Sequence, residues 1–151
     1  MRGAPRADRV FDELKERCQA AGLAVTPQRL VIYRTLVASF DHPSPDVVFE
    51  RVKAQMPSLS LATVYKTLET LVTLGVASEL PATGATKRYD ANMGRHHHLV
   101  CDACNAIEDF TDPLLDLKAP KPRNGFVPRA VSVHVHGLCR RCSQQGVRIT
   151  Q

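Results

Sequence analysis

The chain has 151 residues, enough for one ordinary domain or two small ones with a buried core. Lys and Arg together number 20 and Asp and Glu 15, which gives a formal net charge of +5 at pH 7. This basic balance permits nucleic-acid binding but does not establish it. The sequence has no apolar run of membrane-spanning length and no signal segment after its basic first residues. We therefore expect a cytosolic (cytoplasmic) protein whose thiols stay reduced.

The N-terminal half contains four segments with helical periodicity. In the first, Val10, Leu14 and Cys18 recur at i, i+4 and i+8 before Gly22. The next three each begin after a hydroxyl side chain that can cap a helix, and two have proline at the first helical position. Such helices joined by short connections are typical of a helix-turn-helix domain. The expected helices span residues 10–21, 27–40, 45–56 and 61–74, and Thr26, Ser44 and Ser60 cap the last three.

A basic hairpin is expected directly after the fourth helix. Val76–Leu80 is a strand candidate, residues 81–84 (P-A-T-G) form the turn, and Thr86–Tyr89 returns with Lys87 and Arg88. Helices followed by a small basic hairpin make a winged helix. In such a domain the fourth helix lies in the major groove of DNA and the hairpin contacts the DNA backbone.

The first turns of the fourth helix, S-L-A-T-V-Y-K-T, carry side chains that suit DNA. Ser60, Thr63, Tyr65 and Lys66 lie away from the apolar stripe of this helix. Hydroxyls, an aromatic ring and a cation near a helix N-terminus can contact phosphate and a thymine methyl group. An ordinary solvent-facing helix could carry the same residues, so it is the neighbouring basic hairpin that favours DNA binding.

The C-terminal half changes to a period of two, which indicates strands. The expected elements are strands over 96–100 and 106–110, a third strand within 126–136, a short helix over 112–118 and a polar tail over 143–151. Pro120 and Pro122 prevent the helix from continuing. A sheet of this size has a modest core, so we expect a metal clamp, a partner subunit or both to stabilise it.

Two C-x-x-C pairs frame this half, Cys101 with Cys104 and Cys139 with Cys142. Four thiolates are the ligand set of a closed tetrahedral zinc site. Two disulfides or unrelated buried thiols are the alternative, which a reducing compartment disfavours. Because four sulfur ligands leave no open position, we expect a structural zinc ion. Cys18, the fifth cysteine, is expected to pack in the helical core.

Three consecutive histidines precede the first cysteine pair. His96 and His98 point to one face of the predicted strand and can bind one metal ion as neutral imidazoles. Asp109 returns beside them if the first two strands pair. Such nitrogen and oxygen donors suit Fe(II), Mn(II) or Zn(II). Surface or hydrogen-bonded histidines are the alternative.

Six motifs then occur in a fixed order: T-P-Q-R (Thr26–Arg29), H-P-S (His42–Ser44), S-L-A-T-V-Y-K-T-L (Ser60–Leu68), K-R-Y-D (Lys87–Asp90), H-H-H-L-V-C-D-A-C (His96–Cys104) and C-R-R-C (Cys139–Cys142). Together they resemble the Fur superfamily of metal-responsive transcriptional regulators, from about Gly22 to Cys142. The resemblance implies a homodimer that represses transcription, binds double-stranded DNA with a palindromic operator and is not an enzyme. Arg29 joins the expected DNA contacts.

The resemblance also implies an α+β fold in named parts. A winged helix-turn-helix domain spans residues 1–84, and the wing end and hinge span 85–95. A small α/β dimerisation and metal-binding domain with the four-cysteine zinc site spans 96–142, and residues 143–151 are a polar tail.

By the same resemblance, a regulatory Fe²⁺ or Mn²⁺ ion is bound by His42, Asp90, His96, His98 and Asp109, with Zn²⁺ as a substitute in vitro. His42 belongs to the DNA-binding half, Asp90 to the hinge and the other three to the sheet. One ion bound by all of them would fix the angle between the domains. The spacing of the two recognition helices in a dimer would then depend on the metal.

Members of this family that respond to peroxide, the PerR branch, carry aspartate at the positions of Asp90 and Asp109, where iron-uptake regulators often carry glutamate. In them, bound Fe(II) reacts with hydrogen peroxide, ligand histidines are oxidised and DNA is released. The resemblance therefore favours a peroxide sensor in which His42 and His96 are oxidised. A regulator of iron or manganese levels without peroxide chemistry is the alternative. The zinc-uptake branch uses a cysteine ligand, and none is available near Asp90.

Some residues depart from the family pattern. A second sheet-domain metal site would need histidine at Val131, although His97 and Asp116 occupy other positions of that site. His134 and His136 could form a weak metal site or be exposed polar residues on a strand.

Two other classes of protein fit the sequence less well. A zinc-dependent hydrolase needs a general base beside an open coordination position. Glu108 is the only nearby glutamate, and strand alternation directs it away from the side of Asp109. The chain also lacks the H-E-x-x-H and H-x-E…C-x-x-C patterns. A zinc-stabilised adaptor without DNA binding is disfavoured by the capped helices and the basic hairpin.

Overall fold

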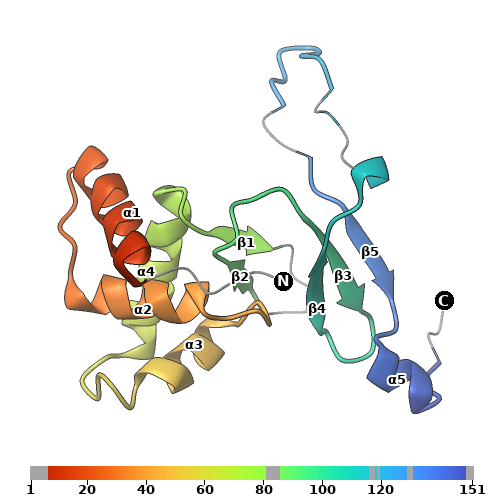
Figure 1. Ribbon diagram of the computed structural model, residues 1–151, viewed down its shortest axis with the longest axis horizontal. Coiled ribbons are helices and arrows are strands. Elements are labelled where there is room, and N and C mark those ends of the chain that lie inside the picture. The colour runs from red at the N-terminus through yellow and green to blue at the C-terminus, as the bar shows by residue number, and fades with distance from the viewer. Residues whose placement is uncertain (1–6, 81–85, 116–117, 119, 129–130, 149–151) are drawn as a thin grey trace. The chain divides into compact units, whose positions relative to one another are not determined.

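The computed structural model describes residues 7–80, 86–115, 118, 120–128 and 131–148. The chain divides into two compact units, Met1–Met93 and Gly94–Gln151. Figure 1 shows helices and a short hairpin in the first unit and a three-stranded sheet in the second. This segregated helix and sheet content confirms the α+β class expected from the sequence.

Four helices form the core of the first unit. They are α1 (Ala7–Ala20), α2 (Pro27–Val37), α3 (Pro45–Val52) and α4 (Leu61–Thr73). Helix α2 contacts the other three, and α3 also contacts α4. Their apolar faces form one buried cluster, which includes Leu14, Ile32, Leu36, Val48 and Leu68. Cys18 lies in this cluster with 0% of its surface exposed, which confirms its predicted place in the core.

The predicted helix starts are confirmed by their caps. The hydroxyl of Thr26 accepts a hydrogen bond from the backbone N–H of Arg29 (3.2 Å), and the hydroxyl of Ser60 accepts one from Thr63 (3.1 Å). Ser44 caps α3 in the same way (3.4 Å). Each cap satisfies an N–H group that the first turn of a helix leaves without an intrahelical partner.

Two predicted helix ends are wrong. Helix α2 ends at Val37 and not at Phe40, whose side chain is 57% exposed and so contributes little to the core. Helix α3 ends at Val52 and not at Met56. Met56 precedes a proline, and the proline ring disfavours the helical conformation of the residue before it.

A short hairpin follows α4, as the sequence predicted. Strands β1 (Ser78–Leu80) and β2 (Arg88–Asp90) are antiparallel, and Glu79 lies opposite Tyr89. Strand β1 packs against α4, and β2 packs against α2. The first strand is shorter than predicted: it begins at Ser78 and not at Val76, which packs in the core. The predicted turn at residues 81–84 lies outside the described residues.

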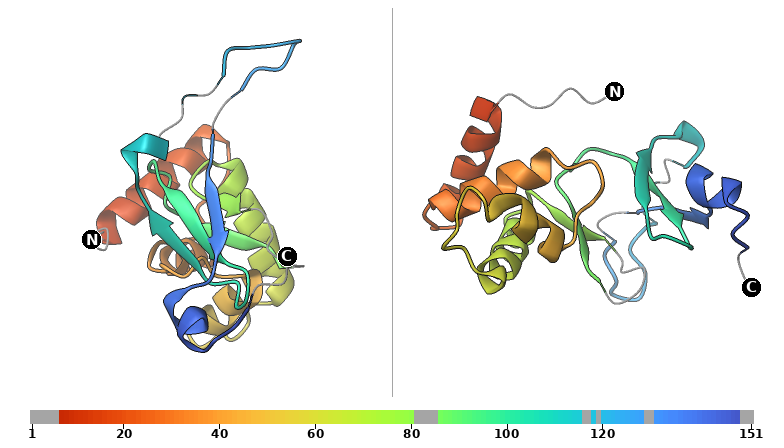
Figure 2. Two further views of the ribbon diagram at one scale, coloured as in Figure 1. Left: turned by 90° about the vertical axis from the view of Figure 1, so that its right-hand side faces the viewer. Right: turned by 90° about the horizontal axis from the view of Figure 1, so that it is seen from below.

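The second unit contains a sheet with the strand order β4–β3–β5. Its strands are β3 (His97–Cys101), β4 (Ile107–Phe110) and β5 (His134–Gly137). Strand β3 is antiparallel to β4 and parallel to β5, and the left view of Figure 2 shows the three side by side. Helix α5 (Arg140–Gln144) follows β5 and ends with two residues of the expected polar tail.

The predictions for residues 112–136 were only partly correct. A single 3-10 turn, η1 (Pro113–Leu115), forms where a helix was expected, and residues 116–117 lie outside the described part. Strand β5 lies at the end of the segment 126–136, which was predicted to contain a strand, and it begins at His134. Asn124 and Gly125 both have positive φ (50° and 79°), the combination preferred in tight hairpin turns. The chain therefore reverses just before the segment that was predicted to contain the strand.

None of the described helices is both long and apolar enough to cross a membrane.

Candidate metal centres

The four cysteines of the two C-x-x-C pairs come together in the second unit. Cys101 ends β3, and Cys104 lies in the turn that follows. Cys139 is the N-cap of α5, and Cys142 lies within that helix. All four sulfur atoms lie within 4.8 Å of one another. This arrangement fits a tetrahedral ion with four sulfur ligands.

The described cysteines are free thiols. The sulfur atoms of Cys104 and Cys139 are 3.7 Å apart, well beyond the roughly 2.05 Å of a disulfide bond. The structure therefore contains free thiols and not the alternative disulfides.

Backbone N–H groups stabilise thiolates in this cluster. The N–H of Cys139 donates to Cys101 Sγ (3.3 Å), and with the N–H of Cys104 it lowers the pKa of Cys101 to about 6. The N–H of Ala106 is the main cause of a lowered pKa at Cys104. Burial raises the pKa of Cys142 to about 12. Some thiolates are thus favoured before metal binds, and binding would displace the protons that remain.

No role for Arg141 was predicted from the sequence. Its guanidinium hydrogen-bonds to the Cys104 sulfur, which raises the pKa of Arg141. Four thiolates around a divalent ion carry a net charge of −2, so a neighbouring cation stabilises the loaded site. The two arginines between the cysteines of the second pair were the available signal.

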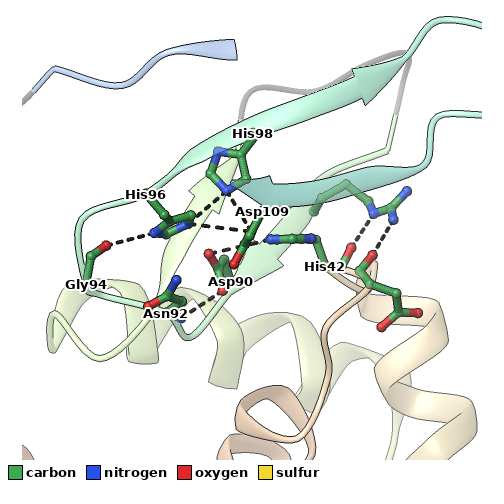
Figure 3. A network of polar contacts seen from close by, with 9 residues as sticks. His42, Asp90, Asn92, Gly94, His96, His98 and Asp109 are labelled. Atoms are coloured by element: carbon green, nitrogen blue, oxygen red, sulfur yellow. Dashed lines mark hydrogen bonds and ion pairs between the residues drawn. The ribbon is translucent and has the colours of Figure 1, made fainter. Parts of the chain in front are cut away.

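A second set of donors lies on paired strands of the same unit. His98 is directly opposite Asp109 in the β3–β4 register, and His96 lies just before β3. The Nε2 atoms of His96 and His98 are 3.0 Å apart. They lie 3.7 and 3.6 Å from Asp109 Oδ1. The predicted pairing that brings Asp109 beside the two histidines is confirmed (Figure 3).

The orientation of His96 suits a metal ligand. Its Nδ1 lies 2.7 Å from the backbone oxygen of Gly94. A carbonyl can only accept, so Nδ1 carries the proton and Nε2 presents its lone pair toward His98 and Asp109. A backbone contact of this kind commonly fixes the tautomer of a metal-binding histidine. No residue-type pattern could have revealed it, because the acceptor is a main-chain atom.

The first unit holds its own pair of donors. His42 Nε2 lies 3.6 Å from Asp90 Oδ2, and both side chains are almost completely buried (2% and 5% exposed). Asp90 is the last residue of β2, and its Oδ1 accepts a hydrogen bond from the N–H of Asn92 (2.7 Å). His42 lies in the loop between α2 and α3 and has a positive φ of 50°. These contacts are drawn in Figure 3.

Both sets consist of imidazole and carboxylate side chains in partly or fully buried positions. Imidazole nitrogen and carboxylate oxygen are the donors preferred by Fe(II), Mn(II) and Zn(II). The residues present therefore fit the kind of ion expected from the sequence.

The exposed start of α4 carries the predicted DNA-contacting residues. The Ser60 and Thr63 hydroxyls are 2.8 Å apart and form part of the helix cap. Tyr65 is 37% exposed, and its hydroxyl lies 3.3 Å from a carboxylate oxygen of Asp46. Lys66 is exposed.

The other predicted DNA contacts lie in different surroundings. Lys87 is exposed at the hairpin and lies 3.1 Å from Glu79. Arg29 donates to the backbone oxygen of Ala24. Arg88 is half-buried, and its guanidinium donates to backbone oxygens of the loop before α3.

The remaining histidines of the sheet have local partners. His97 is buried beside the Phe110 ring, with centroids 5.5 Å apart. His134 stacks on His98 (5.1 Å), and His136 Nδ1 lies 2.9 Å from Asp102 Oδ1. Within the described residues, no metal-capable group includes any of His97, His134 and His136. Asp116, which was assigned to a position of the second sheet-domain metal site, lies outside the described residues.

The register also places Glu108 as strand alternation predicted. Glu108 lies opposite Leu99, whereas the next residue, Asp109, lies opposite His98. Successive side chains on a strand point to opposite faces, so Glu108 does not share the side of Asp109. Glu108 therefore does not supply the general base that the hydrolase alternative needs beside His96 and His98.

Comparison with known proteins identifies the family. Residues 20–136 match the model of the ferric uptake regulator family. This chain belongs to that family. The matched span includes the histidine and aspartate donors of both units and the first cysteine pair. The chain is therefore a metal-responsive transcriptional regulator, as its motifs indicated.

Curated relatives within the family include peroxide-responsive repressors. The peroxide-responsive repressor PerR of Staphylococcus epidermidis is 30% identical over 141 residues, which are 92% of this chain and 94% of that protein.

Solved structures support the fold. PerR from Streptococcus pyogenes, a structure described as a basis for peroxide sensing and gene regulation, is 30% identical with a TM-score of 0.52. The match covers 88% of this chain and 92% of that one. The ferric uptake regulator Fur of Helicobacter pylori, with three functional metal-binding sites, has a TM-score of 0.74 at 21% identity. That match covers 95% of this chain and 97% of that one.

Proposed function

We propose that this protein is a homodimeric, metal-dependent transcriptional repressor that senses peroxide through a bound Fe(II) ion. The observation that carries the proposal is the convergence of His96, His98 and Asp109, whose donor atoms lie within 3.7 Å of one another. The mixed nitrogen and oxygen set suits a divalent first-row metal. A 30% identical peroxide-responsive relative over 92% of the chain supports the same function.

The regulatory ion would also take ligands from the first unit. Three donors in the second unit leave a first-row divalent ion short of its preferred coordination, and the His42–Asp90 pair supplies two more of the same kind. An ion that needs all five ligands binds only when the two units adopt one arrangement. The metal would therefore shift the population toward that arrangement, to which DNA binds more tightly.

A structural zinc ion would be bound by Cys101, Cys104, Cys139 and Cys142. Their sulfur atoms are close enough for one ion, and the main-chain N–H groups already favour two of the thiolates. With four sulfur ligands the site is closed, so this zinc would stabilise the second unit and take no part in sensing.

The domain assignment made from the sequence completes the proposal. Residues 1–84 would bind DNA, 85–95 form the wing end and hinge, 96–142 form the dimerisation and metal-binding domain, and 143–151 form a polar tail. The DNA would be a palindromic duplex in the cytoplasm, contacted by the start of α4 and the hairpin. The candidates are Arg29, Ser60, Thr63, Tyr65, Lys66 and Lys87. Arg88 was also predicted from the sequence as a DNA contact, but its guanidinium donates to backbone oxygens of the loop before α3.

Apolar surface on the second unit supports a dimer. Leu99 on β3 and Val135 on β5 are 40% and 42% exposed, and they border a cavity of about 320 Å³. Leu114 and Phe126 are 87% and 70% exposed. Leu99 and Val135 lie opposite each other on neighbouring strands and form one apolar surface that a partner copy would cover.

The chemistry of sensing balances as a two-electron oxidation. Bound Fe(II) would supply the redox chemistry that activates hydrogen peroxide. One oxygen atom of the peroxide is transferred to an imidazole carbon of His42 or His96, and the other leaves as water. An oxidised imidazole is a poorer ligand, so metal affinity and DNA affinity fall together.

The test uses protein with its structural zinc intact, loaded anaerobically with Fe(II) or Mn(II). DNA binding is followed by fluorescence anisotropy before and after micromolar hydrogen peroxide, and peptides containing His42 and His96 are examined by mass spectrometry. We expect only the iron form to release DNA and to gain one oxygen atom on a histidine. If both forms stay bound and unmodified, the protein is the alternative, a regulator of iron or manganese levels.

A further inference from the structure

The guanidinium of Arg88 binds the loop that carries His42. Its Nε donates to the backbone oxygen of His42, and its Nη2 donates to the backbone oxygen of Asp41 (2.7 Å). Arg88 was predicted from the sequence, together with Lys87, as a DNA contact. Lys87 is exposed, whereas Arg88 is half-buried, and burial lowers the pKa of its guanidinium. The two neighbouring cations therefore have different surroundings.

All three residues of β2 contact this loop. Besides Arg88, Tyr89 donates its backbone N–H to the Pro43 oxygen (3.2 Å), and Asp90 faces His42 Nε2 (3.6 Å). The strand thus contacts the loop at Asp41, His42 and Pro43.

The loop adopts a conformation that needs support. His42 has φ of 50°, a left-handed value that is uncommon for a residue other than glycine and carries a conformational cost. A second arginine holds the same loop from α3, because Arg51 donates to both carboxylate oxygens of Asp41 (3.0 and 2.6 Å). The imidazole of His42 is thereby held in one place beside Asp90.

We propose that Arg88 is a positioning residue for the regulatory metal, which orients His42 through its backbone, and is not a phosphate contact. This inference rests on the proposed role of His42 and Asp90 as metal ligands. Strand β2 then supports two of the proposed ligands: Asp90 supplies one, and Arg88 holds the backbone of the other, His42. Groups that orient a metal ligand commonly change metal affinity by about 10- to 100-fold.

The geometry predicts that lysine cannot replace Arg88. The planar guanidinium places two donors at two different carbonyl groups, whereas a lysine ammonium is a single point charge on a flexible stem. A phosphate contact, in contrast, would be largely retained by lysine because it depends mainly on charge.

The experiment measures Mn(II) binding and DNA binding separately in the full-length, zinc-loaded protein. Mn(II) affinity is measured by isothermal titration without DNA. DNA affinity is measured by anisotropy at saturating Mn(II) over a range of salt concentrations. The variants are Arg88→Lys and Arg88→Met, with Lys87→Met as the matched control, and circular dichroism confirms that each is folded.

We expect both Arg88 variants to bind Mn(II) about tenfold more weakly, with unchanged DNA affinity and salt dependence once the metal site is saturated. Lys87→Met should give the reverse pattern, with unchanged Mn(II) affinity and a salt slope smaller by about one. Unchanged Mn(II) affinity in Arg88→Met would overturn the inference alone. Full Mn(II) affinity in Arg88→Lys would also overturn it, since charge would then suffice. Wild-type protein that binds no Mn(II) beyond its zinc would overturn the proposed function as well.

Discussion

The two units of the chain are stabilised by different means. The first has a continuous buried cluster from four helices and the hairpin, with side chains such as Ile32, Leu36 and Leu68 almost fully buried. Among the described residues of the second unit, the buried apolar and thiol side chains are Val100, Cys101, Ile107 and Cys142. Two of these four are thiols of the proposed zinc site. A core this small cannot offset the conformational entropy of folding by itself.

The difference explains why ligand chemistry is concentrated in the second unit. Buried histidines, a carboxylate and four thiols occupy positions that apolar side chains would fill in a self-sufficient domain. Buried polar groups of this kind are costly unless they are paired or bind an ion. The first unit should therefore stay folded without metal, and the second should not.

Zinc removal gives the largest expected effect. Cys101→Ser should abolish zinc binding and unfold the sheet of the second unit, because structural zinc sites in small domains contribute on the order of 10 kcal/mol. Hydrogen exchange measured by peptide mass spectrometry should show loss of protection in β3, β4 and β5 and retained protection in α2 and α4. Zinc content is measured in the same samples.

Cys18→Ser is the matched control for this experiment. It also removes one thiol, but from the helical core of the first unit, so it should retain its zinc. A zinc-free Cys101→Ser protein with a fully protected β3 would show that the small core is sufficient and would remove the contrast between the units.

A smaller effect is expected at the histidine and carboxylate donors. Asp109→Asn keeps the size of the side chain but removes the negative charge that faces His96 and His98. We expect at least roughly tenfold weaker Mn(II) binding by isothermal titration, with unchanged zinc content and unchanged protection of the sheet. The loss should be confined to Mn(II) binding, because the proposed zinc site does not involve this carboxylate.

Asp102→Asn provides the control for charge. Asp102 belongs to the same unit and contacts His136 (2.9 Å), but it is not one of the converging donors. Its replacement should leave Mn(II) affinity unchanged. Equal weakening by both substitutions would indicate a general electrostatic effect of the unit and would argue against a defined site at His96 and His98.

The same contrast governs what the sequence could reveal. The helix starts at Thr26, Ser44 and Ser60 were predictable, because capping depends on residues a few positions apart. The cysteine pairs and the H-x-H pattern were readable for the same reason. Local spacing is sufficient when one motif supplies both the ligands and the turn between them.

Features that depend on the main chain or on competing turns were not predictable. The contacts of Arg88 with the loop of His42 and of Gly94 with His96 use carbonyl oxygens, which every residue possesses. The valine alternation from Val131 to Val135 did not reveal that β5 begins only at His134, and the turn at Asn124 and Gly125 was not predicted. The motif resemblance indicated which residues bind the metal together. The main-chain contacts that orient them could be seen only in the structure.

The smallest expected effect tests the claim that the first unit is stable by packing alone. Tyr33 of α2 donates its hydroxyl to Glu13 of α1 (2.8 Å), and burial, followed by this hydrogen bond, raises the pKa of Tyr33 above its usual value near 10. Tyr33→Phe should destabilise the unit by about 1 kcal/mol at neutral pH, the net contribution of one such hydrogen bond. Urea unfolding followed by circular dichroism at 222 nm reports this, since most helical residues belong to the first unit.

The pH dependence follows from the raised pKa of Tyr33. The folded state retains the phenol proton at a pH where the unfolded chain has lost it, so wild-type stability is complete below about pH 10 and falls above it. Tyr33→Phe lacks this proton, so the stability difference between wild type and variant should be constant up to about pH 10 and then shrink. The other tyrosines are common to both proteins and cancel in the difference. A difference that stays constant above pH 10 would mean that ionised Tyr33 is tolerated in the fold, and that the helical core is more open to water than its packing indicates.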